Sequence, residues 1–312
     1  MIRDRVALRI GTRHLLRLIV IVTSVLFVFL GIIIWNNLAS LPVGRTTIAV
    51  AGDPIMILSW DGQRGKLGVM AIPGDVRIEG VYGTGQLPLV SLLKLEALDG
   101  TKQGLFVYSL SDALGLPVVG VIRGNDSLNV ERAIESLSPL SPTGWQWEGG
   151  VSWPMRFRMW LVFKSLRPDA IWSLHLQDQG VFRDTVLPDG SGTRVWNVER
   201  FDTAAGSLLE IDSVRRETLR VLVVNTTIAT GLGGRVARVL ERAGMAVTAV
   251  ENDSSEQDVC SVHAKKEVRE SQAVLFIRNV YGCTVSDEQG DRRVDITVRL
   301  GNGNAKNYRW GQ

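Results

Sequence analysis

An uninterrupted apolar run near the N-terminus constrains this chain more than any other feature. Residues 18–35, LIVIVTSVLFVFLGIIIW, carry no charged side chain. As a helix they would extend about 27 Å, close to the thickness of a bilayer core. Since a helix of a soluble protein keeps a polar face, this run predicts a transmembrane helix over residues 18–36. A cleaved signal peptide is the alternative, but the run is longer than such peptides use, and NNLAS lacks small residues at both cleavage positions.

The positive charge of the chain is concentrated before this run. Residues 1–17 hold five arginines and one aspartate, whereas the other basic and acidic residues nearly cancel. Basic residues on one side of a span predict that this arm stays in the cytoplasm and that the bulk of the chain is extracytoplasmic. The body has no basic face evident from composition, so we expect no nucleic-acid partner.

The two cysteines, Cys260 and Cys283, lie near the C-terminus. In the oxidising space outside a membrane they can persist as a disulfide, and two buried thiols are the alternative. The three histidines, His14, His175 and His263, stand apart from one another and from the cysteines, so no metal site is expected from them.

The sequence after the span predicts a mixed α/β fold: an α/β module over residues 46–212 (the first module) and a small α/β domain over residues 219–302 (the C-terminal module), followed by a tail, 303–312. Alternating and apolar runs predict the strands and helices of the first module. The expected strands are 46–52, 54–61, 65–75 and 116–124, and the expected helices are 90–100, 105–115, 127–140 with Ser127 as N-cap, and 154–166.

A tryptophan cluster lies in the turn-rich segment 141–154. Trp145, Trp147 and Trp153 could stack on sugar rings or enter a membrane interface, and packing beneath a long loop is the alternative.

The C-terminal module opens with a strand, a glycine-rich turn, a helix and a second strand, residues 219–253. A dinucleotide fingerprint needs a third glycine for close helix–strand packing, but Val236 occupies that position after Gly231 and Gly233. We therefore interpret the glycines as letting the helix start close to the sheet. Strands at 260–264, 283–286 and 294–301 and a helix over 268–282 are expected to follow.

Residues 219–302 resemble the LytR C-terminal domain family. The resemblance depends on the V-x-V-x-N strand end, the G-L helix start, the L-x-x-x-G helix end and the terminal DITVRLG. That domain commonly follows catalytic LytR–CpsA–Psr domains in bacterial envelope proteins. The resemblance implies an extracytoplasmic module without established catalytic residues, with envelope polymers as the suspected ligand.

The first module is similar to a degenerate LytR–CpsA–Psr domain. IAVAGDP nominates Asp53, and GKLGVMAIPGDV retains Asp75 but has Gly74 where the family motif has arginine. The family's enzymes transfer a phospho-glycan from a polyprenyl carrier, with arginines on the pyrophosphate and carboxylates on a divalent metal. The candidate catalytic residues are then Asp53, Asp75, Arg77 and Arg123, with Arg132 as a further donor. Solvated residues at strand ends and turns are the alternative for both aspartates.

These features predict a single-pass cell-membrane protein with a non-catalytic binding or scaffolding role at the bacterial surface, in wall-polymer or envelope maintenance. Its partners would be the membrane and cell-wall polymer or envelope proteins, and no cofactor is expected. The alternative is a LytR–CpsA–Psr-type phosphotransferase that attaches glycopolymer to the wall and uses Mg²⁺. Gly74 argues against this alternative, because a pyrophosphate site needs its arginine donors.

Overall fold

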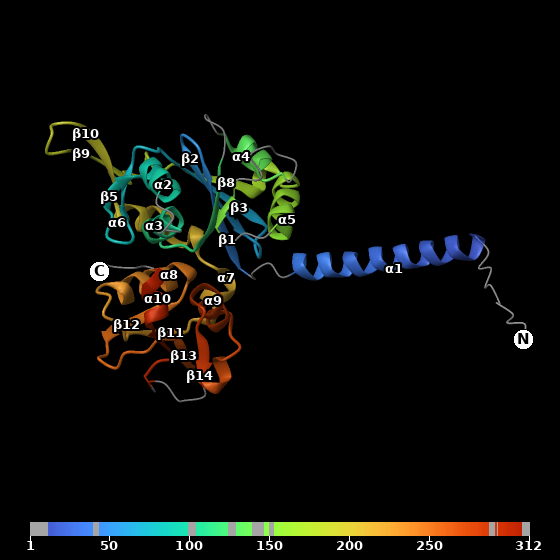
Figure 1. The fold of residues 1–312 in the computed structure, drawn as a ribbon. Helices are drawn as coiled ribbons and strands as arrows, with labels where there is room; N and C mark the ends of the chain where they lie inside the picture. Colours follow the sequence, from blue (N-terminus) through green and yellow to red (C-terminus); the bar gives the residue numbers. More distant parts are fainter. Residues whose placement is uncertain are drawn as a thin grey trace, which may run out of the picture.

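The computed structural model describes residues 12–39, 44–98, 104–123, 129–138, 147–149, 153–286, 291 and 293–307. Ten α-helices and three mixed sheets form this described part, so the α/β fold class is confirmed. Helix α1, Thr12–Ala39, projects away from the two modules (Figure 1). Within it, residues Leu16–Ile34 are exposed and apolar, with a mean hydropathy of 2.8, and are long enough to cross a membrane.

A six-stranded sheet with both faces buried forms the centre of the first module. Alternate residues of β1 and β2 face two different helical layers: Ala49 and Ile57 pack with residues of α2 and α3, whereas Ile48 and Leu58 pack with residues of α4 and α5. Burial on both faces explains why these strands are almost continuously apolar. In sheet order the strands are β7 (Trp147–Gly149), β6 (Val118–Arg123), β1 (Arg45–Ala51), β2 (Ile55–Asp61), β3 (Lys66–Ile72) and β8 (Ile171–Leu174). The helices are α2 (Leu89–Leu98), α3 (Leu105–Leu114), α4 (Val130–Ser136), α5 (Trp153–Lys164) and a 3-10 turn at Pro168–Ala170.

A second, four-stranded sheet extends the first module. Its strands, in order, are β5 (Gly85–Pro88), β4 (Arg77–Gly80), β10 (Gly192–Trp196) and β9 (Phe182–Val186). Strands β4, β5 and β8, of four residues each, were not predicted from the sequence. Helix α6 (Val198–Ala205) and a 3-10 turn (Gly206–Leu209) then lead toward the C-terminal module.

The C-terminal module is a five-stranded sheet with helices on one face. Val221 and Val223 of β11 share a core cluster with residues of both α8 and α9, whereas Leu222 and Val224 form a small separate cluster with Val294. One face of the sheet therefore packs on helices, and the other packs on none of the helices that the structure describes. The strands, in order, are β12 (Ala246–Asn252), β11 (Arg220–Asn225), β15 (Ile296–Leu300), β13 (Ser261–Ala264) and β14 (Thr284–Ser286). The helices are α7 (Asp212–Glu217), α8 (Leu232–Ala243), α9 (Gln272–Tyr281), α10 (Asn302–Asn307) and a 3-10 turn at Lys266–Val268.

Several element boundaries differ from those predicted. Helix α4 is capped by Asn129, whose Oδ1 accepts a hydrogen bond from the backbone of Arg132 at 2.8 Å; the expected cap, Ser127, lies outside the described residues. Helix α9 begins after Ser271, whose hydroxyl caps it, so the expected helix over 268–282 is wrong in its first turn. Helix α10 occupies part of the segment that was expected to be a tail.

The glycines at the start of α8 do what the sequence predicted for them. Gly231, with φ of 81°, caps the helix in the left-handed region that favours glycine. A methyl group on Gly233 would lie 2.7 Å from Cγ1 of Val250 on β12, so this glycine permits the helix to approach the sheet closely. The parallel pairing of β11 with β12 completes the predicted β-α-β unit.

Two adjacent glycines of α8 provide a matched test of this packing. Gly234→Ala should raise the free energy of unfolding by up to about 1 kcal/mol, since alanine favours helix and no atom lies within 4 Å of its new methyl group. Gly233→Ala should instead lower it by about 1 kcal/mol, because the clash with Val250 outweighs the helix propensity. Urea denaturation of both variants measures the difference, and equal values would contradict the close approach.

Candidate functional site

Strand ends of the central sheet bring the candidate aspartates together. Strands β1, β3 and β6 run in the same direction, because β1 is parallel to β6 and two antiparallel steps separate it from β3. Their C-terminal ends therefore lie at one edge. Asp53 follows β1, and Gly74 and Asp75 follow β3; the backbone N–H of Gly74 donates to Oδ1 of Asp53 at 3.3 Å. Arg123 ends β6 at the same edge, but its side chain lies outside the described residues.

Asp75 is held by an arginine that the sequence did not single out. Arg194 of β10 donates from Nε to Oδ2 at 3.0 Å and from Nη2 to Oδ1 at 2.5 Å, a bidentate pair. The side chain of Asp75 is 60% exposed and that of Arg194 32%. Since these residues are 119 positions apart, no local sequence pattern could have predicted the pair. Both carboxylate oxygens of Asp75 are thus engaged within the protein.

Arg77 and Arg132, two other nominated arginines, lie elsewhere in the first module. Arg77 of β4 donates to the carbonyl oxygen of Gln86 at 2.5 Å and makes no ion pair with Asp53 or Asp75 among the described residues. Arg132 lies exposed on α4. Within the described part of the chain, no group of three or more His, Cys, Asp or Glu side chains is placed to hold a metal ion. Among the described residues, Arg194 already holds both oxygens of Asp75, the carboxylate that the family motif retains.

Three arginines of α8 attach the C-terminal module to the first module. Arg238 donates to Asp202 of α6 at 2.7 and 2.8 Å, and Arg242 bonds the same carboxylate. Arg235 pairs with Asp112 at the end of α3. Burial raises the pKa of the Asp112 carboxyl, and Arg235 opposes this effect. Burial also lowers the pKa of Arg242, whose side chain is only 6% exposed.

This junction was missed in the sequence, although its signal is present there. The three arginines follow one another at i, i+3 and i+7, which places them on one face of a helix. The opposite, apolar face of the same helix buries Val236 and Leu240. Arg238 also donates to the carbonyl oxygen of Ala113 at 3.0 Å, near the C-terminal end of α3, where cations are stabilised.

A hollow of about 360 Å³ lies at this junction, and Arg77 contributes to it. The charged side chains around it are largely bound to one another or to backbone carbonyls, as described for Arg77, Arg235 and Arg238. Other lining residues include Ile78, Glu79, Gln86, Asp112, Val195, Trp196, Gly231 and Gly234. Arg77, one of the nominated arginines, therefore lies at the boundary between the modules.

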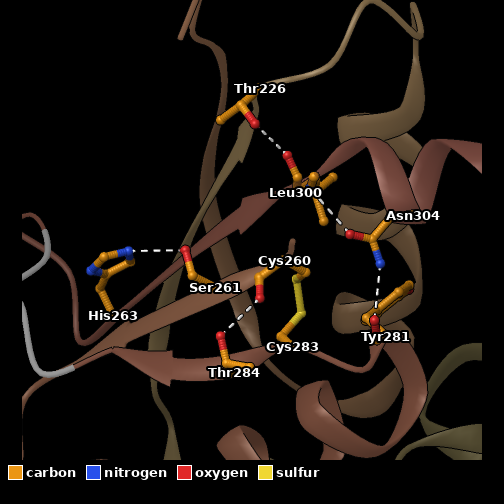
Figure 2. Close-up of a disulfide and its surroundings, with 10 residues drawn as sticks. Thr226, Cys260, Ser261, His263, Tyr281, Cys283, Thr284, Leu300 and Asn304 are labelled. Carbon is orange, nitrogen blue, oxygen red and sulfur yellow. Dashed lines mark hydrogen bonds between the residues drawn. A yellow bond between two sulfur atoms is a disulfide. The ribbon is translucent and has the colours of Figure 1, made fainter. Parts of the chain in front are cut away.

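A disulfide joins Cys260 and Cys283 at the starts of β13 and β14 (Figure 2). These strands are parallel neighbours, and the backbone N–H of Thr284 donates to the carbonyl oxygen of Cys260 at 3.0 Å. Both cysteines are 4% exposed.

The prediction for the tryptophan cluster of 141–154 falls on residues that the structure does not describe. Trp145 and the side chains of Trp147 and Trp153 lie outside the described residues.

Residues 218–303 match the family model LytR_C, described as the LytR cell envelope-related transcriptional attenuator. This match confirms the resemblance predicted for the C-terminal module. No curated protein matches the chain.

Solved structures similar to the chain come from the LytR–CPS2A–psr family. One is YwtF (TagT) with bound octaprenyl pyrophosphate lipid: 13% identity, TM-score 0.39, covering 54% of this chain and 90% of that one. Another is TagV of Bacillus subtilis: 9% identity, TM-score 0.40, covering 54% and 97%. A third is TagT bound to LIIa-WTA: 14% identity, TM-score 0.39, covering 53% and 89%. At these values the similarity carries no argument about what this chain binds.

Proposed function

We propose, from the match of residues 218–303 to the LytR_C family model, that the chain is a membrane-anchored protein of the bacterial envelope that binds or scaffolds without catalysis. In this proposal α1 crosses the membrane with its N-terminus in the cytoplasm, and both modules lie outside. The exposed apolar surface of Leu16–Ile34 supports the anchor, and the arginines before it support the orientation. The disulfide is consistent with an oxidising compartment.

The non-catalytic part of the proposal depends on the hydrogen bonds that Arg194 makes to Asp75. Phosphoryl transfer from a polyprenyl pyrophosphate needs arginines on the anion and carboxylates available for a metal ion. Here Gly74 provides no side-chain donor, and Arg194 binds both oxygens of Asp75. The functional groups retained from the family motif therefore serve the fold of the first module.

A paired transfer and binding assay tests the proposal. The full chain, reconstituted in liposomes, should transfer nothing from a polyprenyl-pyrophosphate-linked glycan to peptidoglycan, with or without Mg²⁺. It should sediment with isolated walls that carry their secondary glycopolymer more than with walls stripped of that polymer. Gly74→Arg should fold, because its Cβ would lie at ordinary distances from Val90 and Asp53, 3.5 and 3.7 Å. It should remain inactive as well, because Asp75 stays bound to Arg194.

Two results would overturn the proposal. Transfer by the unmodified chain above a no-protein control would establish the phosphotransferase alternative. Equal sedimentation with intact and stripped walls would remove the wall polymer as a partner.

A further inference from the structure

The helix-free face of the C-terminal sheet carries a hollow that the junction and the strand-end aspartates do not involve. Side chains alternate between the faces of a strand, so Leu222 and Val224 point away from the core under α8 and α9. Thr297 and Arg299 pair directly with them on β15 and share that face. The hollow measures about 520 Å³, within the range of small-molecule sites.

The floor of this hollow is apolar and its wall is polar. Leu222 and Val224, 5% and 6% exposed, form the floor. Two buried polar side chains stand beside them: Thr297, 5% exposed, and His263, 9% exposed. Nε2 of His263 is 3.1 Å from the hydroxyl of Ser261 (Figure 2), and no hydrogen bond of its Nδ1 occurs among the described residues. An apolar floor beside side chains that donate and accept hydrogen bonds suits the ring face and hydroxyl groups of a sugar.

Among the described residues, carboxylates outnumber the cations at the rim. Asp253 is bound by Arg299 at 2.6 Å, and Asp291 by Arg293 at 2.6 Å. Glu251 also lines the hollow, but it makes no ion pair or hydrogen bond among the described residues. Hydrogen bonds lower the pKa of Asp253 and of Asp291 to about 2, so both stay ionised at any physiological pH. Arg293 also interacts electrostatically with Glu251, so three described carboxylates share two described arginines, and one net negative charge among them is left for a ligand to balance.

We infer that this hollow binds a hydroxyl-bearing primary amine, the chemistry of an amino sugar whose amine is not acetylated. Glu251 takes the ammonium group, the floor of Leu222 and Val224 takes the apolar ring face, and His263 and Thr297 meet the hydroxyl groups. The inference deepens the proposed wall-binding role and rests on it for the polymer that would supply such a sugar. It assigns that role to the C-terminal module and to a defined set of side chains.

Calorimetric titration of the detergent-solubilised full chain tests the site, with D-glucosamine as the probe and N-acetyl-D-glucosamine and D-glucose as matched neutral sugars. Glucosamine should bind, and the affinity for each neutral sugar should be at least about fivefold lower. This is the factor expected for the loss of one partly exposed ion pair. Glu251→Gln should weaken glucosamine by the same factor and leave the neutral sugars unchanged. Glu267→Gln, an exposed acid outside the hollow, is the control and should change nothing.

Each contrary result is decisive. Equal affinities for the three sugars, no detectable glucosamine binding, or a glucosamine affinity unaffected by Glu251→Gln would overturn the inference. Sedimentation with intact walls separates this failure from that of the proposed function. If the chain still sediments selectively with intact walls but does not bind glucosamine, the proposed wall-binding role is retained and the amine site is rejected. The wall polymer supplies the amino sugar only if soluble glucosamine reduces the sedimentation of the unmodified chain with walls and does not reduce that of the Glu251→Gln variant.

Discussion

Asp61→Ala is expected to lower the free energy of unfolding by about 3–5 kcal/mol, more than the Gly233, Gly234 or Asp75 substitutions change it. Asp61 and Arg45 form an ion pair at 3.0 Å in which each side chain is only 4% exposed. Removal of the carboxylate leaves the guanidinium buried with the hydroxyl of Ser59 and the carbonyls of Leu208 and Glu210. It also removes the oxygen that accepts the backbone N–H groups of Gln63 and Arg64. Urea denaturation of the detergent-solubilised chain measures the loss.

Asp75→Ala is the matched control, since it removes the same side chain from another arginine pair. The Asp75–Arg194 pair is 60% and 32% exposed, so water replaces the lost contact. We expect a change within about 1 kcal/mol. If the two variants lost equal stability, burial would not be the cause of the difference between the two ion pairs.

Reduction of Cys260–Cys283 is expected to lower the free energy of unfolding by roughly 3 kcal/mol on the chain-entropy model. The bond closes a loop with a sequence separation of 23, so its removal restores many conformations to the unfolded chain. Urea denaturation with and without dithiothreitol measures the effect. Before reduction, a thiol reagent should label no cysteine of the unfolded chain, because the sequence has only these two.

The Cys260→Ala/Cys283→Ala double variant provides the control. Its denaturation midpoint should not respond to dithiothreitol, and its stability should fall near that of the reduced chain. Labelling of both cysteines in chain taken directly from cells would contradict the disulfide, and with it one support for an extracytoplasmic location.

Local patterns predicted those elements whose burial follows a simple period. The strand β11 and the helix α8 were predicted as parts of the strand, turn, helix and strand of residues 219–253, and the two elements pack on each other in one core cluster. Strands β4 and β8, of four residues each, were not predicted, although the equally short β13 was. Their positions depend on partners distant in sequence: β4 pairs with β10 and β8 with β3.

The candidate site was predictable only in part, for the same reason. The sequence nominated Asp53 and Asp75 singly, at the ends of two strands; that these ends share one edge of the sheet follows from the strand pairings of the structure. The role of Asp75 was not predictable, because it depends on Arg194, which reaches it from another sheet. The arginine face of α8 could have been found from its spacing, but its partners, Asp112 and Asp202, come from two separate helices.

The attachment of Arg45 limits how far the modules can move from the bilayer. Arg45 binds Asp61 in the first module and the carbonyls of Leu208 and Glu210, close to the start of the C-terminal module. Only six peptide steps separate it from Ala39, the last residue of α1, a reach of roughly 20 Å at full extension. With α1 in a membrane as proposed, this short connection keeps both modules close to the lipid surface. Ligands within reach would then lie at the membrane or in the layer just above it, not in the outer wall.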